Sequence, residues 1–492
     1  MRTMTVRELA AATGGRLVSG NENDSIERVV IDSREAAAGD VFFALKGEKN
    51  DGHDYLLQAA AAGCRTMVVC DEEKTEGLRA SHPDLNLILT EDSKRGLQLL
   101  GAYYLDSLDL RTRIGVTGSV GKTSTRDFIY YVMSQGFRTA RSIKNYNNSF
   151  GLPLSLLSFP SDTEAAVVEL GMDGKGSIGV LADLVRPDIG VLTNIGISHI
   201  ENFPEEGREG ILKTKLEITQ NFTDDSILIV NDSNDMLHGL DMKERGIRGR
   251  LIRVGTDSSC DYVVSGVEDK GVQGISFDLE HEGKKWHADI PVPGAHNAIN
   301  AGLAVACGNL NGISTEDALE GFSHAVLTEK RLSVREKDGI RIIDDTYNAA
   351  PDSVKSAINT LMSTKTEGAG RHIAILGDMG ELGSEAVNGH RACGEAAFNK
   401  GVDVLLAVGS LSENTVKGWQ DAAVRAGHKV RKVNDMPLVI LDEDTGKAAE
   451  FFENKEMVIN GIMDHIHAGD CLLIKASRFM ALEKIVKHIL ES

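Results

Sequence analysis

The stretch Ile114-Gly-Val-Thr-Gly-Ser-Val-Gly-Lys-Thr-Ser124 decides the fold of the middle of the chain. An apolar run leads into a loop with two glycines, and the loop leads into an amphipathic segment with Phe128, Val132 and Met133. Glycines let the backbone curl so that its N–H groups face phosphate oxygens, and the N-terminus of the following helix favours negative charge. The order strand, glycine loop, helix therefore predicts a phosphate-binding loop.

This loop is a shorter variant of the common pattern. Val116 stands where the first glycine of the six-residue spacing would be, which leaves Gly118-Ser-Val-Gly-Lys-Thr123. We expect Lys122 to reach the terminal phosphates of a nucleotide and the Thr123 hydroxyl to bind Mg2+. The loop alone leaves the reaction open, because kinases, ATPases, GTPases and ligases all use such loops.

The regions around the loop predict an α/β protein. From residue 113 to about 231, β-branched runs alternate with helical patterns, as in parallel βαβ units, and shorter alternating runs at 251–293 suggest appended antiparallel strands before a helix near Asn297. The alternation restarts after about 328, where Pro351 opens a helix. Strands are expected there at 341–343, 373–376, 402–408 and 471–474.

A chain of 492 residues is too long for one ordinary hydrophobic core. We expect a small α/β domain at 1–106, a central ATPase-type domain with a mostly parallel sheet at 107–327, and a Rossmann-like domain at 328–492. Hydrophobic residues make up 41% and charged residues 26%, a balance typical of folded globular proteins.

The net charge of −20 opposes general attraction to nucleic acid or to an anionic membrane, so neither is an expected partner. Residues 1–10 carry charges of both signs and do not resemble a secretory signal, and no stretch is apolar enough to span a bilayer. The six cysteines are scattered without metal-ligand or redox spacing. These features predict a cytoplasmic location.

Three polar residues beyond the loop are candidates for chemistry. Glu169 ends an apolar strand at the edge where ligands collect in such folds, and position alone leaves a metal ligand and a salt bridge equally open. His199 follows another buried-type strand, although a lone histidine is more often structural. Lys215 lies on a predicted helix with Lys213 and Glu217, and the pattern alone favours a solvated charged face.

Together these motifs resemble those of the Mur ligase family, and the resemblance covers nearly the whole chain. The motifs that carry it lie at 32–34, 39–47, 51–53, 117–123, 145–148, 151–153, 169–172, 194–199, 215–217, 294–300, 344–351, 376–383 and 475–478. Those in the two terminal domains are similar to the motifs of the family member that adds D-alanyl-D-alanine.

The resemblance implies that the chain uses ATP and Mg2+, with Lys122, His199 and Lys215 as catalytic residues and Lys215 carbamylated. The implied metal ligands are Thr123, Glu169, His199 and Lys215. The implied nucleotide-binding residues are Thr117, Gly118, Ser119, Val120, Gly121, Lys122, Thr123, Asn297, Asn300, Arg331, Asp345 and Tyr347. The implied substrate-binding residues are Ser33, Arg34, Asn147, Asn148, Asn348 and Ser477.

The implied substrates are UDP-N-acetylmuramoyl-tripeptide, held by the first domain, and D-alanyl-D-alanine, presented by the third. ATP would activate the tripeptide carboxylate as an acyl phosphate, which the dipeptide amine then attacks. Closure of the domains around these substrates, in a monomer, would orient the groups and exclude water.

The chain also departs from the family pattern, at Val120, Ser124, Ser177, Ala295 and Ala476, none of which is an implied metal ligand. Three alternatives stay open: a Mur-type ligase adding another amine, a folate polyglutamate ligase, and an ATP-binding regulator without ligase activity. The glycine-rich motif at 377–383 opposes the first, because the diaminopimelate- or lysine-adding member carries an Asp-Asn-Pro signature there. The first domain opposes the second, and a lysine suited to carbamylation opposes the third.

Overall fold

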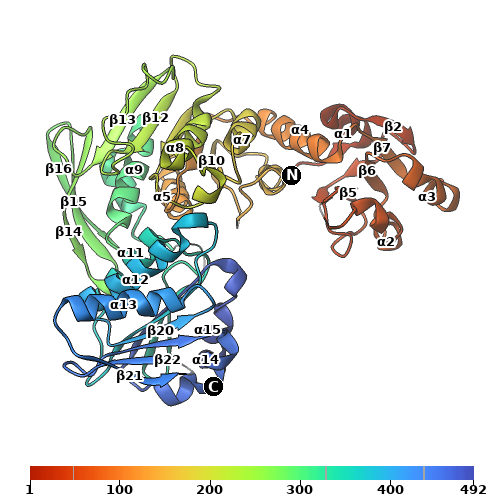
Figure 1. Ribbon diagram of the computed structural model, residues 1–492. Helices are drawn as coiled ribbons and strands as arrows, with labels where there is room; N and C mark the ends of the chain where they lie inside the picture. The colour runs from red at the N-terminus through yellow and green to blue at the C-terminus, as the bar shows by residue number, and fades with distance from the viewer. Residues whose placement is uncertain (48, 144, 327, 329, 436–437) are drawn as a thin grey trace.

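The computed structural model describes residues 1–47, 49–143, 145–326, 328, 330–435 and 438–492. Three main sheets with flanking helices follow one another along the chain, which confirms the predicted three-domain α/β fold. In Figure 1 the N-terminal domain stands to one side, whereas the central and C-terminal domains pack against each other. The predicted domain boundaries stay a prediction, and residue 327 lies outside the described residues.

The N-terminal domain is built on a sheet with strand order β2-β7-β6-β5-β4, in which β4 to β7 are parallel and β2 is antiparallel to β7. Its elements are β1 (Met4–Thr5), α1 (Val6–Thr13), β2 (Arg16–Ser19), β3 (Ser25–Ile26), β4 (Arg28–Val30), β5 (Asp40–Phe43), α2 (Leu56–Ala61), β6 (Thr66–Val69), α3 (Glu76–Ser81), β7 (Asn86–Leu89) and α4 (Ser93–Asp106).

Helix α4 attaches this domain to the next one. Asp92 caps the helix by accepting the N–H groups of Lys94 and Arg95. Gly101 then lets α4 approach the following domain closely, since a Cβ at this position would lie 2.9 Å from the Cα of Pro153. Apolar packing along α4 therefore sets where the N-terminal domain sits.

The central sheet has the order β16-β15-β14-β13-β12-β11-β8-β10-β9. Its elements are β8 (Thr112–Thr117), α5 (Lys122–Met133), β9 (Thr139–Arg141), α6 (Gly151–Leu157), β10 (Ala165–Glu169), α7 (Ser177–Val185), β11 (Ile189–Leu192), α8 (Gly207–Leu216), β12 (Ile227–Asn231), β13 (Arg250–Gly255), β14 (Tyr262–Asp269), β15 (Ile275–His281), β16 (Lys284–Ile290), α9 (Asn297–Leu310) and α10 (Thr315–Glu320).

The antiparallel part of this sheet starts later than the sequence suggested. Strand β13, at the start of the stretch expected to be antiparallel, pairs in parallel with both β12 and β14, and only β14 to β16 are antiparallel. The predicted helix near Asn297 is confirmed as α9. Strand β8 lies between β10 and β11, and α5 and α9 cover one face of it, where Phe128 meets Phe322 edge to face at 5.2 Å.

The C-terminal sheet has the order β17-β18-β24-β19-β20-β23-β22-β21. Its elements are β17 (Ser333–Lys337), β18 (Ile340–Asp345), α11 (Pro351–Ser363), β19 (His372–Gly377), α12 (Ala386–Lys400), β20 (Val404–Val408), α13 (Glu413–Arg425), β21 (Val430–Asp435), β22 (Leu438–Asp442), β23 (Ala448–Phe452), α14 (Lys455–His465), β24 (Cys471–Lys475) and α15 (Glu483–Glu491). The four strands and the Pro351 helix predicted here are confirmed within a few residues.

Candidate active site

The glycine loop between β8 and α5 has the shape that the sequence predicts. Gly118 has φ +153° and Gly121 has φ +82°, and a Cβ at Gly118 would lie 1.9 Å from the hydroxyl of Thr193. The middle of the loop is held by the two residues that follow β11: the Thr193 hydroxyl donates to the carbonyl of Val120 at 2.6 Å, and the Asn194 side chain accepts the Val120 N–H at 2.9 Å. Only glycine fits at position 118.

Two lysines meet at one carbonyl of this loop. Lys122 Nζ and Lys215 Nζ donate to the Gly118 oxygen at 2.7 and 2.9 Å. Lys215 has no exposed surface, so burial lowers its pKa well below the ordinary value, and burial also lowers the pKa of Lys122. The solvated position that the pattern alone favoured for Lys215 is wrong. Lys213 is the exposed residue. Two residues along a helix correspond to a rotation of about 200° around its axis, so Lys213 and Lys215 face nearly opposite sides.

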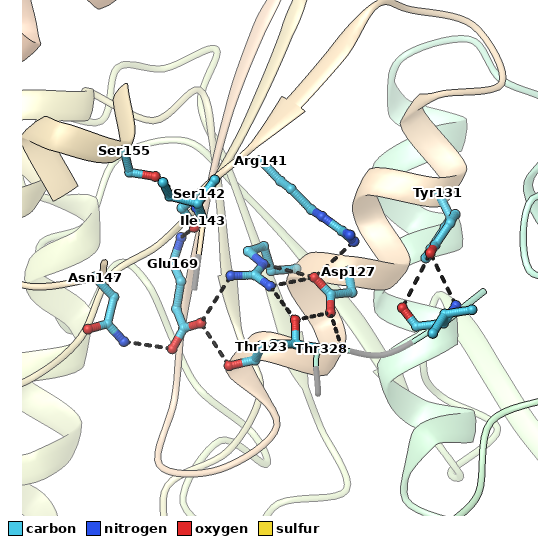
Figure 2. A network of polar contacts seen from close by, with 12 residues as sticks. Thr123, Asp127, Tyr131, Arg141, Ser142, Ile143, Asn147, Ser155, Glu169 and Thr328 are labelled. Carbon is cyan, nitrogen blue, oxygen red and sulfur yellow. Dashed lines mark hydrogen bonds and ion pairs between the residues drawn. The ribbon is translucent and has the colours of Figure 1, made fainter. Parts of the chain in front are cut away.

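Glu169, at the end of β10, accepts two hydrogen bonds in Figure 2. The Thr123 hydroxyl donates to it at 2.9 Å and the Asn147 amide at 2.8 Å, and a guanidinium nitrogen of Arg126 lies 3.9 Å away. Burial opposes ionisation of this carboxyl, but the charges of Lys122 and Arg126 hold its pKa below the ordinary value. An ionised carboxylate thus lies beside a hydroxyl oxygen, a combination that a hard divalent cation prefers.

A cavity of about 290 Å³ opens between this loop and the C-terminal domain. The sequence-predicted residues that line it are Ser119, Val120, Gly121, Lys122, Thr123, Asn297, Asn300, Arg331, Asp345 and Asn348. Thr117 and Gly118 precede these residues in the loop, and Tyr347 lies under Arg331, whose guanidinium carbon is 4.3 Å from the ring centre. The cavity is therefore shared by two domains.

Lys475 and His296 are among the cavity-wall residues that the sequence analysis missed. Lys475, at the end of β24, is buried and donates to Asp345 at 2.6 Å and to the carbonyl of Asn348 at 2.8 Å. His296, at the start of α9, lies on the central-domain side, where its Nδ1 pairs with the Ser356 hydroxyl of α11 at 2.7 Å. Both belong to motifs that carried the family resemblance, and that membership was the available signal.

His199 does not line this cavity but lies at a second contact between the same two domains. Its Nδ1 is 2.8 Å from a carboxylate oxygen of Glu381, a residue that the sequence analysis also missed, and this contact holds the pKa of Glu381 below its ordinary value. His199 and Glu381 both have left-handed backbones, with φ +64° and +62°. Such conformations are costly outside glycine and persist where the surrounding structure holds them.

Several predicted substrate residues make contacts within their own domains. In the N-terminal domain, Ser33 donates to Gln58 at 2.9 Å, and Arg34 pairs with Asp32 two positions before it. Neither Ser33 nor Arg34 is among the described residues that line the cavity. The predicted nucleotide-binding residues therefore gather at the cavity, whereas Ser33 and Arg34 belong to the N-terminal domain, which stands to one side in Figure 1.

The other predicted substrate residues lie nearer to the loop. Asn147 binds Glu169, whereas Asn148 accepts the Gly151 N–H at 2.8 Å at the start of α6. Ser477 accepts the Gly380 N–H at 2.9 Å and so ties two C-terminal motifs together. Roles in substrate binding for these residues stay predictions.

Comparison with known proteins identifies the family. Family models match residues 25–100 (Mur ligase family, catalytic domain), 116–308 (Mur ligase middle domain) and 330–478 (Mur ligase, glutamate ligase domain). A Bacillus subtilis (strain 168) protein named UDP-N-acetylmuramoyl-tripeptide--D-alanyl-D-alanine ligase is 34% identical over 490 residues, covering 99% of this chain and 98% of the relative. The chain belongs to the Mur ligase family. The resemblance seen in the sequence is thereby confirmed.

Solved structures agree with this assignment. This Mur ligase superimposes on MurF from Acinetobacter baumannii with a TM-score of 0.83 and 27% identity, and the match covers 100% of both chains. MurF ligase from Thermotoga maritima, solved in complex with ADP, shares the fold at a TM-score of 0.74 and 23% identity over 94% of this chain and 97% of that one.

Within the described residues, no helix is both long enough and apolar enough to cross a bilayer.

Proposed function

We propose that this Mur ligase joins D-alanyl-D-alanine to UDP-N-acetylmuramoyl-tripeptide in peptidoglycan precursor synthesis, with conversion of ATP to ADP and phosphate. The observation that carries the proposal is the match, over 99% of the chain, to a relative named for that reaction. The cavity between the phosphate loop and the C-terminal domain supports it, because a ligase must bring an activated carboxylate to an amine.

ATP fits the cavity through the chemistry of its walls. The glycine loop and the start of α5 offer N–H groups and a helix dipole to phosphates, and Lys122 adds a positive charge. Arg331 and Lys475 bring further cations from the C-terminal domain, and Asn297 and Asn300 offer amide groups for the other end of the nucleotide. These cations are needed because the chain as a whole carries −20 charge.

Mg2+ fits the oxygen atoms of Thr123 and Glu169, and when bound it would offset the negative charge of the phosphates. A second ion would need His199 and an anionic Lys215. Lys215 suits this role because its amine is buried and its pKa is lowered, so the nitrogen keeps a lone pair that can attack CO2. A C–N bond forms between the neutral amine and CO2, one proton leaves the nitrogen, and the neutral amine at position 215 becomes a carbamate anion.

In the proposed reaction the tripeptide carboxylate takes the terminal phosphoryl group of ATP, because a free carboxylate is a poor acceptor for an amine. Lys122 stabilises the charge on the transferred group. The amine of D-alanyl-D-alanine then attacks the acyl carbon and phosphate leaves. Asn348 and Ser477 would hold the dipeptide, while walls from two domains limit the access of water.

The remaining assignments follow the same proposal. Residues 1–106 would form the domain that binds the UDP-sugar, 107–327 the domain that binds ATP, and 328–492 the domain that binds the dipeptide. Ser33 and Arg34 would contact the UDP-sugar, and Asn147 and Asn148 would contact the same substrate nearer its peptide end. We infer a cytoplasmic location, since the nucleotide substrates are cytoplasmic metabolites, and we propose that the chain acts as a monomer.

The test is phosphate release from ATP with UDP-N-acetylmuramoyl-tripeptide, with and without D-alanyl-D-alanine, together with the product mass. We expect release that requires both substrates, disappears in Lys122→Ala and yields the pentapeptide mass. Release that depends on another amine would support ligase activity but would show that D-alanyl-D-alanine is not the substrate. No release with any amine would overturn the proposal in favour of an ATP-binding regulator.

A further inference from the structure

Helix α5 carries a second polar contact one turn beyond the phosphate loop. Asp127 lies four residues after Thr123, so both side chains point to the same side of the helix, as Figure 2 shows. Asp127 has no exposed surface. Its partner is Thr328, which lies where the chain passes from the central to the C-terminal domain.

The contact between Asp127 and Thr328 is a double hydrogen bond. One oxygen of Asp127 accepts the Thr328 N–H at 3.0 Å and the Thr328 hydroxyl at 2.8 Å. Arg126 and Arg141 bind the other oxygen of Asp127 at 2.6 and 3.0 Å. Hydrogen bonds and ion pairs between a buried carboxyl group and guanidinium groups are stronger than those between neutral groups, so these contacts hold Asp127 firmly in place.

A second contact from the same helix holds the chain just before Thr328. The hydroxyl of Tyr131 accepts the N–H of Val326 at 3.1 Å and donates to its carbonyl at 3.3 Å (Figure 2). Asp127 and Tyr131 are four residues apart on α5. Two successive turns of α5 therefore bind the connection between the domains, one at Thr328 and the next at Val326.

This connection leads directly into the nucleotide cavity. Arg331 lines the cavity only three residues after Thr328, and three residues span at most about 11 Å even when extended. Arg126 lies between the two sites: one guanidinium nitrogen is 2.9 Å from the Thr328 hydroxyl and another is 3.9 Å from Glu169. The position of Thr328 thus limits where Arg331 can point.

We propose that Asp127, with Arg126, is a positioning anchor that holds Thr328 against α5 and thereby directs Arg331 onto the nucleotide. Arg126, Asp127 and Thr328 do not line the cavity, so they act through Arg331 and not on the substrates themselves. The anchor rests on the proposed function only in assuming that the cavity takes a nucleotide. It gives the C-terminal domain a fixed point on the helix that binds the phosphates.

The test uses the full chain, four single variants and one double variant that combines Thr328→Val with Arg331→Ala. Thr328→Val removes the hydroxyl bond to Asp127, Thr328→Ser restores it, and Arg331→Ala removes the residue that is positioned. Thr139→Val is the matched control, because Thr139, like Thr328, is half-buried, and its hydroxyl donates to the carbonyl of Phe137 in the central domain, away from the anchor. The readouts are the melting temperature, the Kd for ADP with Mg2+ by calorimetry, and kcat and KM for ATP.

We expect Thr328→Val to weaken ADP binding and to raise the KM for ATP by about tenfold, the scale of one hydrogen bond to a charged group. Its melting temperature should match that of Thr139→Val, and Thr328→Ser should bind ADP as the unmodified chain does. In the Arg331→Ala background, Thr328→Val should cause no further loss, because the anchor acts through Arg331.

Independent, multiplicative losses from Thr328→Val and Arg331→Ala would overturn the anchor, as would a loss fully explained by a lower melting temperature. Absence of ADP binding by the unmodified chain would overturn it as well. The binding measurement requires no ligation. If the chain binds ADP in the expected pattern but forms no product, the anchor stands and the proposed reaction fails.

Discussion

The nucleotide cavity and the N-terminal domain are held in place in different ways. Around the cavity, polar side chains of the central and C-terminal domains bind each other directly, as in the His199–Glu381 and His296–Ser356 pairs. The N-terminal domain is joined to the rest mainly through apolar packing of α4, and its predicted substrate residues Ser33 and Arg34 do not face the cavity.

This difference separates two requirements of the proposed reaction. Phosphoryl transfer depends on several charges held at fixed places, and Lys122, Arg331 and Lys475 gather such charges around the cavity. The UDP-sugar substrate is long, and one end can bind the N-terminal domain while its peptide end reaches the cavity. Changes near the cavity should therefore act on nucleotide binding and on the rate, and changes in the N-terminal domain should act on the affinity for the sugar substrate.

The largest expected effect comes from Lys215, the buried lysine under the phosphate loop. Lys215→Met keeps the side-chain volume but cannot form a carbamate, so we expect kcat to fall by about 10² to 10³-fold, the scale of losing one preorganised electrostatic group. The unmodified chain should also lose activity in CO2-free buffer and regain it with bicarbonate. Initial rates of phosphate release measure both effects.

Lys213→Met is the control, because Lys213 lies on the same helix and is exposed. It should keep its rate with and without bicarbonate. A Lys215→Met chain with full activity, or an unmodified chain indifferent to CO2, would show that position 215 does not carry the proposed anion.

Glu381→Ala tests the contact between the domains, with a smaller expected effect. Removing this carboxylate leaves His199 without its partner across the interface, so closure of the C-terminal domain should be less favourable and kcat/KM for ATP should fall about five- to tenfold. Stability should change by less than about 1 kcal/mol, because Glu381 is half exposed and exposed ion pairs contribute little. Steady-state kinetics and thermal melting report the two quantities separately.

Glu395→Ala provides the comparison, since Glu395 pairs with Arg425 inside the C-terminal domain and spans no interface. Equal kinetic losses in the two variants would mean that the Glu381 contact has no special part in closure. A loss confined to Glu381→Ala would support the contact as part of the closed state.

Local chemistry made part of the site predictable from the sequence. The phosphate loop was recognisable because Gly118 and Gly121 adopt backbones that other residues avoid, and because strand, loop and helix follow one another without a break. Pro351 marked a helix start for a similar reason: proline fits the first turn. These features depend on residues that are neighbours in the chain.

Features that depend on tertiary packing were not predictable in this way. The charge pattern around Lys215 is that of a solvated helix face, and only the packing of α8 against the loop buries it. Glu381 and Lys475 stand in recognised motifs, but their partners His199 and Asp345 are more than a hundred residues away in sequence. The first contact comes from packing between two domains and the second from the pairing of β18 with β24, and periodicity and spacing encode neither.

The smallest effect is expected in the N-terminal domain, where Arg34→Ala removes an exposed cation from the predicted sugar site. We expect the KM for UDP-N-acetylmuramoyl-tripeptide to rise by about three- to fivefold, because one solvated charge contact contributes on the order of 1 kcal/mol. The kcat and the KM for ATP should stay unchanged, since Arg34 does not line the cavity. Arg7→Ala is the matched control, because Arg7 is an exposed arginine of the same domain paired with Glu22. A fall in kcat for Arg34→Ala alone would mean that the two regions are coupled more tightly than their packing indicates.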